Sequence, residues 1–488
     1  MKYVNDFDLI VEYADTIREL KAKVDRNSII EINSIMEDLG IYSPRYGVAS
    51  VDTTEFKICQ LIYFMFAYRS DTVNKELVFS PLGNLLLDNR NDSIKKSKIF
   101  ATMLYGLPYN HPYNKMSPDF NIYPYRLIFK LLCEPELDYK LYQDEVFYYV
   151  IWEKSINGEN YAQLVKSIIE FRKKSPYTKY EDFKSLLSLE DALANALHET
   201  TYLFGQLASA GIATIAKGNR IGVLYHGGFG RKEVPDFLSP EELARVNRTG
   251  KRTYTTDCLR LRSNIAPYIQ KLLSAYRFDE KPHDLLDTLG LQDYILQLYN
   301  FYPQELLSEI GIKQDKIQTM LNITKNIKKY SRNQEKGDCY KFENILADAF
   351  NEFEDVEANP IGGSGNTDVE CMYLTIDEKF AIEAKSTQTK LSGINAGRLQ
   401  LHRNKIDAKY TIIVAPFYMP SVEDDILNTK NVMITASSLS NFLYQCTIHA
   451  KDNISYKPLY DIVQNFMGTN ITYKVNEFVS THYGIGKA

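Results

Sequence analysis

The chain has 488 residues, of which 44% are hydrophobic and 24% are charged, and its formal net charge is −5. This length exceeds what one hydrophobic core ordinarily serves, so we expect roughly two to four domains. The composition is that of an ordinary soluble protein, and the longest apolar run, residues 58–68, spans about half of a membrane. These features exclude a transmembrane helix and a uniformly basic protein, but the net charge does not exclude a local basic surface.

The first ten residues, MKYVNDFDLI, carry acidic residues where a secretory signal needs a basic region and then an unbroken apolar stretch. We therefore expect a cytoplasmic protein. The cysteines form neither a C-x-x-C pair nor a cluster with histidine, which argues against a structural zinc site or a disulfide framework. We expect free thiols at Cys59, Cys133, Cys258, Cys339, Cys371 and Cys446.

Residues 1–155 repeat apolar side chains at helical spacing between short loops that contain proline and asparagine, as in YRLIFKLLCEPE and LYQDEVFYYVIW. This pattern predicts a helical domain.

Residues 156–280 combine helices with a short β-rich stretch. Two helices with a break at residues 198–201 precede two β-rich runs, residues 212–216 and 221–225, around the turn at residues 217–220. The order helix, turn, helix, hairpin is typical of a winged helix-turn-helix, so we expect a DNA-recognition subdomain.

Positive charge gathers in this second subdomain. Residues 201–276 hold eleven Lys/Arg and five Asp/Glu, an excess of 11 − 5 = 6, in a chain that is acidic overall. The second helix of a helix-turn-helix places its N-terminal residues over base edges, and the wing and loops contact phosphates. The DNA-binding candidates are Thr200, Thr201, Tyr202, Gln206, Lys217, Asn219, Arg220, Arg231, Lys232, Arg248, Lys251 and Arg252.

The last two predicted regions differ in type. Residues 281–335 return to helical spacing and end in a lysine-rich segment, which predicts a helical linker subdomain. Residues 336–488 read as a helix (340–355), a Gly-rich loop (361–366), strands at 367–375 and 380–386, a helix (391–406), strands at 410–418 and 432–436, and a helix (437–446). This order predicts a small α/β domain with a mixed sheet.

Three residues of this domain form a candidate catalytic site. Because alternate side chains of a strand share a face, Glu383 and Lys385 point the same way. A hairpin turn near residue 378 would bring Asp368 to the same end of the sheet. Carboxylates with free positions for water and phosphate suit Mg²⁺, so Asp368 and Glu383 are the metal-ligand candidates. Lys385 could orient the attacking water or stabilise charge on the transition state.

The sequence leaves alternative roles for several further residues around this site. Glu343, on the preceding helix, could add a ligand through water, and we count it among the catalytic candidates. Glu370 shares the face of Asp368 and is either a second ligand or a neighbour. Arg398, Gln400 and His402 follow the catalytic strand, either as DNA-backbone contacts or as helix surface.

Asp368 followed by Glu383-Ala384-Lys385, with Glu343 on the preceding helix, resembles the PD-(D/E)xK nuclease family, although Thr367 replaces the proline. With a DNA-reading region in front, and the segments FSPLGNLLLDN, KIFATMLYGLPYN and NIYPYRLIFKLLCE in order, the chain resembles type IIS restriction endonucleases of the FokI, AlwI and BstNBI kind. The resemblance implies recognition of a short asymmetric duplex site by a monomer, with residues 1–155 as a helical DNA-recognition subdomain beside the one at residues 156–280. It also implies Mg²⁺-dependent cleavage at a fixed distance outside that site, with transient homodimerisation of catalytic domains.

Two other functions agree with the same pattern. One is a structure-specific or nicking nuclease of DNA repair or of a mobile element. The other is a DNA-binding regulator whose nuclease-like domain is inactive. Mg²⁺-dependent cuts at reproducible sites distinguish a restriction enzyme from both.

Overall fold

The computed structural model describes residues 6–20, 26–40, 51–69, 77–113, 119–174, 200, 203–216, 225–226, 236–237, 257–282, 291–311, 316–363, 365–450 and 453–483. Within these ranges, no helix combines the length and the apolar composition that a membrane crossing requires.

The N-terminal unit, the described residues 6–311, is mainly helical, as its apolar spacing predicts. Short β-strands interrupt the series. In chain order its first elements are α1 (Phe7–Leu20), α2 (Arg26–Asp38), α3 (Val51–Tyr63), β1 (Ala67–Arg69), β2 (Leu77–Phe79), α4 (Pro81–Asp88), α5 (Ser93–Gly106), α6 (Pro124–Leu132), the 3₁₀ helix η1 (Pro135–Leu137), β3 (Leu141–Tyr142), α7 (Gln143–Tyr148), η2 (Val150–Trp152) and α8 (Gly158–Lys173).

The second half of this unit adds a small sheet to the helices. A helix at residues 203–209 leads into β4 (Ala213–Ala216), and β5 (Tyr225–His226) pairs with β6 (Asp236–Phe237). β7 (Cys258–Leu261) lies between β3 and β4 and is antiparallel to both. Helices α12 (Ala266–Ala275), α14 (Leu291–Tyr299) and α15 (Gln304–Ile310) follow.

The predicted winged helix-turn-helix is only partly visible. Its second helix and first β-run are present as residues 203–209 and β4. The described partner of β4 is β7, which is distant in sequence. The turn at residues 217–220 and most of the second run, residues 221–224, lie outside the described residues, so the wing stays a prediction.

The C-terminal unit, the described residues 316–483, holds the predicted mixed sheet. Its strands have the order β12-β11-β10-β9-β8: β10 is antiparallel to β9 and parallel to β11, and β12 is parallel to β11. The elements are α16 (Lys316–Ser331), α17 (Asp338–Phe350), β8 (Val356–Pro360), β9 (Val369–Tyr373), β10 (Glu378–Ala384), α18 (Ala396–Lys405), β11 (Thr411–Ala415), α19 (Val422–Ile426), β12 (Asn431–Thr435), α20 (Ala436–His449), α21 (Lys457–Asn465) and α22 (Thr472–Tyr483).

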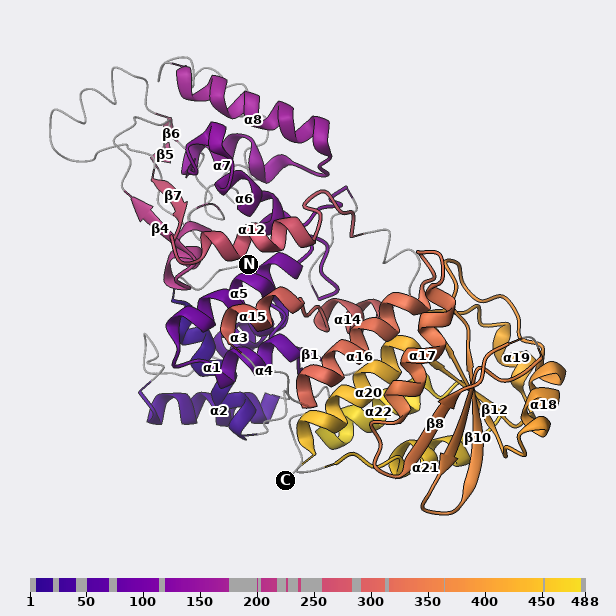
Figure 1. Cartoon of the computed structure of the whole chain (residues 1–488). Helices are drawn as coiled ribbons and strands as arrows, with labels where there is room; N and C mark the ends of the chain where they lie inside the picture. Colours follow the sequence, from indigo (N-terminus) through magenta and orange to yellow (C-terminus); the bar gives the residue numbers. More distant parts are fainter. Residues whose placement is uncertain are drawn as a thin grey trace, which may run out of the picture.

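The central strands of this sheet are covered on both faces. In β11, Ile412 and Val414 join the main core with α17, α20 and α22, whereas Ile413 packs with Leu399 of α18 and Val422 of α19. Continuous apolar strands are typical of parallel pairs buried on both faces. Figure 1 shows α18 and α19 on one side of the sheet and α17, α20 and α21 on the other.

Two separate hydrophobic cores underlie the two units. One cluster of buried residues extends from Phe7 to Ile310, and the second begins at Met320 of α16. Helix α16 packs against α17 and α20 and therefore belongs to the C-terminal core, while α14 of the N-terminal unit also contacts α20. The units lie side by side in Figure 1, with α14 and α16 at their junction.

An aromatic stack in the second core gives a test of this packing. The ring of Phe380 in β10 stacks on Tyr456 and Tyr410, with centroid distances of 4.9 and 5.3 Å, and is fully buried. Phe380→Ala should lower the free energy of unfolding by about 3–5 kcal/mol, because it removes buried area and leaves a cavity. Urea unfolding measures the change. Leu374→Ala, at an exposed turn position, should be nearly neutral, and equal effects of the two substitutions would contradict the packing described.

Candidate active site

The hairpin of β9 and β10 brings Asp368 and Glu383 together. Ile382 pairs with Val369, so Asp368, the residue before β9, lies across from Glu383. The backbone N–H of Ala384 donates a hydrogen bond of 2.7 Å to Oδ2 of Asp368. The turn at residues 374–377 ends on Asp377 with a φ of 53°, a conformation that Asp tolerates. The convergence of Asp368 and Glu383 predicted from antiparallel pairing of the hairpin is confirmed.

Lys385 follows directly after β10 and forms an ion pair with Glu383. Its Nζ lies 2.6 Å from Oε1 of Glu383, whose side chain is only 5% exposed, while the lysine side chain is 34% exposed. The backbone N–H of Lys385 donates to the carbonyl of Val414, which holds the end of β10 against β11. An acid is therefore buried under a lysine that reaches solvent.

Helix α17 brings Glu343 to the same place. Glu343 interacts electrostatically with both Glu383 and Lys385. The loop between β8 and β9 passes close by: a Cβ added to Gly362 would lie 3.4 Å from Oε2 of Glu343, and Gly362 has a φ of +54°. A side chain at residue 362 would thus be strained and would crowd the carboxylate.

Burial and neighbouring carboxylates raise the pKa values of Asp368 and Glu343. Burial, followed by the charge of Glu383, raises the pKa of Asp368 to about 7, against the opposing effects of the Ala384 N–H and Lys385. Burial and Glu383 also raise the pKa of Glu343. Burial together with the neighbouring carboxylates therefore disfavours the charged forms of Asp368 and Glu343, and a bound cation would favour them again.

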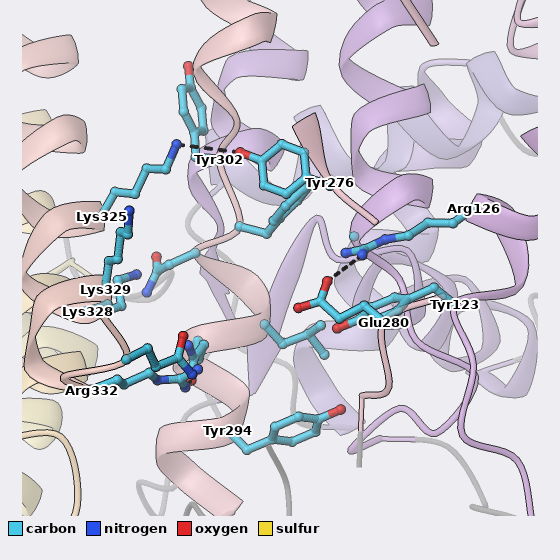
Figure 2. Close-up of a pocket in the computed structure, with 16 residues that line it drawn as sticks. Tyr123, Arg126, Tyr276, Glu280, Tyr294, Tyr302, Lys325, Lys328, Lys329 and Arg332 are labelled. Carbon is cyan, nitrogen blue, oxygen red and sulfur yellow. Dashed lines mark hydrogen bonds and ion pairs between the residues drawn. The ribbon is translucent and has the colours of Figure 1, made fainter. Parts of the chain in front are cut away.

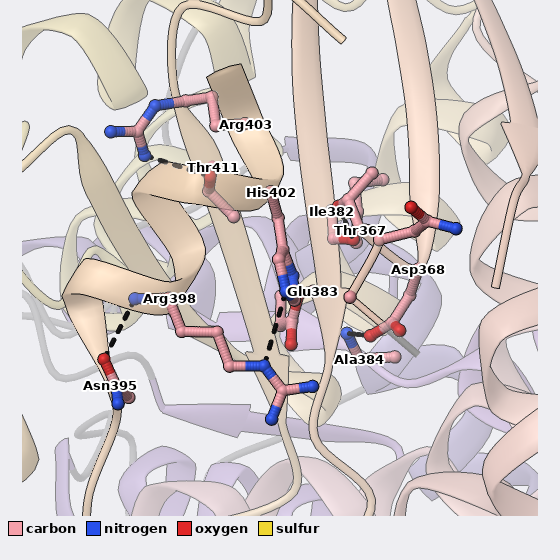
Figure 3. A network of polar contacts seen from close by, with 12 residues as sticks. Thr367, Asp368, Ile382, Glu383, Ala384, Asn395, Arg398, His402, Arg403 and Thr411 are labelled. Carbon is pink, nitrogen blue, oxygen red and sulfur yellow. Dashed lines mark hydrogen bonds and ion pairs between the residues drawn. The ribbon is translucent and has the colours of Figure 1, made fainter. Parts of the chain in front are cut away.

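Helix α18 covers the other side of Glu383 with a histidine. Nδ1 of His402 lies 3.9 Å from Oε2 of Glu383, and Nε of Arg398 is 3.3 Å from Nε2 of the same ring (Figure 3). Burial, as the larger effect, lowers the pKa of His402 although Glu383 opposes it. His402 and Arg398 therefore lie beside the catalytic candidates, an arrangement that helical spacing alone left open.

The donor set fits a divalent cation with few protein ligands. Oε2 of Glu383 is buried and has no hydrogen-bond partner in the described part of the chain. Asp368 supplies a second carboxylate, and hard oxygens with vacant positions are what Mg²⁺ prefers. Among the described residues, no group of three or more His, Cys, Asp or Glu side chains forms a complete metal site. Water and a substrate oxygen would have to complete the coordination.

Glu370 lies apart from this centre. It forms an ion pair of 2.6 Å with Lys379 at the start of β10, whereas Glu383 is at the end of that strand. Of the two interpretations that the sequence left open for Glu370, the structure favours a neighbour over a ligand.

The structure corrects two of the predicted DNA contacts. The side chains of Thr200 and Gln206 are fully buried, and the hydroxyl of Tyr125 donates to Oε1 of Gln206 at 3.5 Å. Neither residue is presented to a DNA groove, because Thr200 is buried and Gln206 lies in a short helix that packs into the N-terminal core. The remaining candidates lie outside the described residues: Thr201, Tyr202, Lys217, Asn219, Arg220, Arg231, Lys232, Arg248, Lys251 and Arg252.

Comparisons with known proteins cover the whole chain. Residues 1–276 match the family described as the N-terminal domain of type II restriction endonuclease HgaI. The type II restriction enzyme HgaI of Avibacterium volantium is 38% identical over 489 residues, which span 99% of this chain and 97% of that protein. The solved structure of restriction endonuclease FokI is 8% identical with a TM-score of 0.28, covering 95% of this chain and 99% of FokI. FokI bound to DNA is 9% identical with a TM-score of 0.26, covering 88% and 84%.

The raised pKa of Asp368 predicts a pH dependence of stability. Folding raises this pKa from 3.8 to about 7, so the native state holds the proton more tightly than the unfolded state. The free energy of unfolding should therefore fall as pH rises from about 4 to about 7. Asp368→Asn, which cannot ionise, should be more stable than the wild type at pH about 8 and similar at pH about 4. Urea unfolding at both pH values measures this, with the exposed Asp377→Asn as control; identical curves for wild type and Asp368→Asn would contradict the site's electrostatics.

Proposed function

The chain belongs to the HgaI family of type II restriction enzymes, and we propose that it is a type IIS restriction endonuclease that hydrolyses DNA phosphodiester bonds at a fixed distance from a short asymmetric site. The observation that carries the proposal is the meeting of Asp368, Glu383 and Lys385 at the end of β10. This meeting occurs in a chain whose full length resembles a restriction enzyme.

The C-terminal unit supports a PD-(D/E)xK nuclease domain. A helix with an acidic residue, α17, precedes an antiparallel hairpin that presents the acids and the lysine, and a helix and a parallel strand follow. Thr367, at the position of the family's proline, donates a hydrogen bond of 3.1 Å to the carbonyl of Ile382. That bond ties the segment before Asp368 to β10, so the threonine maintains the hairpin where the proline is absent.

The side chains divide the phosphodiester chemistry between them. Asp368 and Glu383 would hold Mg²⁺, and Glu343 would join through water. When bound there, Mg²⁺ supplies positive charge at the scissile phosphate and lowers the pKa of a coordinated water. Lys385 is next to Glu383 and partly exposed. Its ammonium group is placed where it can orient the attacking water and stabilise charge on the phosphoryl group. The ion pair with Oε1 of Glu383 positions that lysine, and His402 lies beside Oε2 of the same carboxylate.

The N-terminal unit is proposed to read DNA. The basic excess of residues 201–276 and the helix-strand order around residues 203–216 support a winged helix within residues 156–280. Because Gln206 is buried, we assign base reading to exposed residues around this helix and phosphate contact to the basic loops. Pairing of two C-terminal units for double-strand cleavage is part of the proposal, and a cleavage rate that rises with the square of protein concentration would support it.

Substitution of the strand-end residues tests the catalytic assignment. Asp368→Ala, Glu383→Ala and Lys385→Ala should each slow DNA cleavage by about a hundredfold or more, because each removes charge stabilisation from the reaction centre. Binding to DNA in a gel-shift assay should be retained. Glu370→Gln is the matched control, since it changes an acid in the adjacent strand that pairs with Lys379 instead. Full activity in any of the three alanine variants would refute the assignment of that residue.

Run-off sequencing of plasmid digested with Mg²⁺ tests the type IIS proposal. We expect breaks at one offset from one recurring asymmetric sequence. Breaks at branched or damaged structures would favour the repair or mobile-element nuclease. If the wild type binds DNA and leaves every substrate intact with Mg²⁺, the regulator with an inactive domain is favoured.

A further inference from the structure

A polar cleft of about 270 Å³ lies where the two units meet. One wall comes from the N-terminal unit and carries Tyr123, Arg126 and Tyr276, and the other is helix α16 of the C-terminal unit. Figure 2 shows Lys325 of α16 reaching toward Tyr276 of the opposite wall, with Lys328 and Lys329 beside it on the helix and Arg126 paired with Glu280 across the cleft. The cleft thus joins the unit proposed to read DNA to the unit proposed to cut it.

Positive charge dominates the lining. The cleft has five cationic side chains and one acidic side chain, Glu280, an excess of 5 − 1 = 4. Glu280 already forms an ion pair of 2.6 Å with Arg126, whose guanidinium also stacks 3.7 Å from the ring centroid of Tyr123. Glu280 also attracts Arg332, and Glu305, outside the lining, attracts Lys325. One acid in the lining therefore faces four further cations on α16 and the turn after it, Lys325, Lys328, Lys329 and Arg332.

The spacing of these four residues places them on one face of α16 and the turn after it. Their described hydrogen bonds in the cleft are with neutral groups: Lys325 donates to the hydroxyl of Tyr276 at 3.5 Å, and Arg332 donates to Oε1 of Gln297. Lys329 has an acid, Glu335, at 3.7 Å, outside the cleft. Burial and the neighbouring Arg332 lower the pKa of Lys328 to about 7. An anion in the cleft would restore the protonated form of Lys328.

The remaining lining suits an oxyanion. Tyr294, Tyr302 and Gln334 supply polar groups, and Nδ2 of Asn300 is shielded from solvent without a hydrogen-bond partner in the described ranges. Hydroxyl, amide and guanidinium donors around a small space are the groups that contact phosphate oxygens of DNA. The volume accommodates a phosphate group but is below the roughly 300–1,000 Å³ of pockets for larger ligands.

Helix α16 also connects the cleft to the catalytic strand. The backbone N–H of Thr387, two residues after Lys385, donates to the carbonyl of Ser331 at 2.8 Å. Nε2 of Gln388 donates to the carbonyl of Asn333 at 2.7 Å. Arg332 lies between those two acceptors in sequence and lines the cleft. A ligand held by Arg332 would therefore be fixed in position relative to the segment that carries the catalytic lysine, because Ser331 and Asn333 are hydrogen-bonded to that segment.

We propose that this cleft binds a backbone phosphate of the DNA that runs from the recognition unit toward the cut position. The proposal rests on the proposed function. It adds a sequence-independent contact on α16, placed between recognition and cleavage, that fixes the DNA relative to Lys385.

The test compares two duplexes that contain the recognition sequence defined by run-off sequencing. The long duplex extends to the cut position, and the short duplex ends just after the recognition site. Anisotropy without divalent cations, at several salt concentrations, measures binding by the full chain. Lys328→Gln/Arg332→Gln should bind the long duplex about tenfold more weakly or worse. The slope of the logarithm of its binding constant against the logarithm of salt concentration should become shallower by about one unit for each phosphate that the variant no longer neutralises.

Binding of the short duplex should be unchanged, which also shows that the variant folds. Lys329→Gln provides a second variant, since its side chain is 51% exposed and its removal should not affect folding; it should weaken long-duplex binding in the same direction. Lys409→Gln is the matched control. It removes an exposed charge beside Lys379, at the opposite end of β10 from Glu383, and should bind as the wild type does.

Three results would overturn the proposal. The first is that both cleft variants bind the long duplex with the affinity of the wild type, and the second is that they bind both duplexes equally more weakly. The third is that calorimetry detects binding of inorganic phosphate that the double variant loses while its affinity for both duplexes is unchanged. The last would assign the cleft to a free phosphate. Cleavage of the long duplex by the wild-type protein with Mg²⁺ is measured in parallel. Failure of the wild type to cut refutes the proposed function, whereas cutting combined with any of these three results refutes the cleft proposal alone.

Discussion

The burial of neighbouring carboxylates at the end of β10 is the constraint around which the C-terminal unit is arranged. Asp368 directly precedes β9, Glu383 lies in β10 and Glu343 lies in α17; burial and the charge of Glu383 raise the pKa of Asp368 to about 7. Folding holds them together through the hairpin register, the Ala384 N–H and the packing of α17 on the sheet. Such an arrangement costs stability and persists where a cation and a phosphate can use it.

Much of this centre is predictable from sequence because it depends on local rules. Period-two alternation places Glu383 and Lys385 on one side, and a tight turn returns the chain so that Asp368 faces them. The helix carrying Glu343 is long and regularly amphipathic, and the structure places it at residues 338–350. These elements have short-range causes, so their type and approximate bounds follow from residues 338–386 alone.

Other features depend on long-range packing that no local pattern encodes. Gln206 has the chemistry of a base-reading residue, yet its helix turns that face into the N-terminal core. Strand β8 is short and ends in Pro360, so it lacks a strand signal and exists because β9 pairs with it. His402 reaches Glu383 only because α18 crosses the sheet at that point. Helix α16, expected in a linker, contributes Met320 and Ile327 to the C-terminal core. The cleft arises from that packing.

The carboxylates at the end of β10 are proposed to form a divalent-cation site. Asp368 is partly protonated near neutral pH and would lose its proton when the cation binds. Calorimetric titration of the full chain with Mg²⁺ at pH about 6.5, in buffers of different ionisation enthalpy, counts the protons released on binding. Since Asp368 has a pKa of about 7, the account predicts release of roughly half a proton or more, abolished in Asp368→Asn. Mg²⁺ binding without proton release, or with the same release in both proteins, would contradict it.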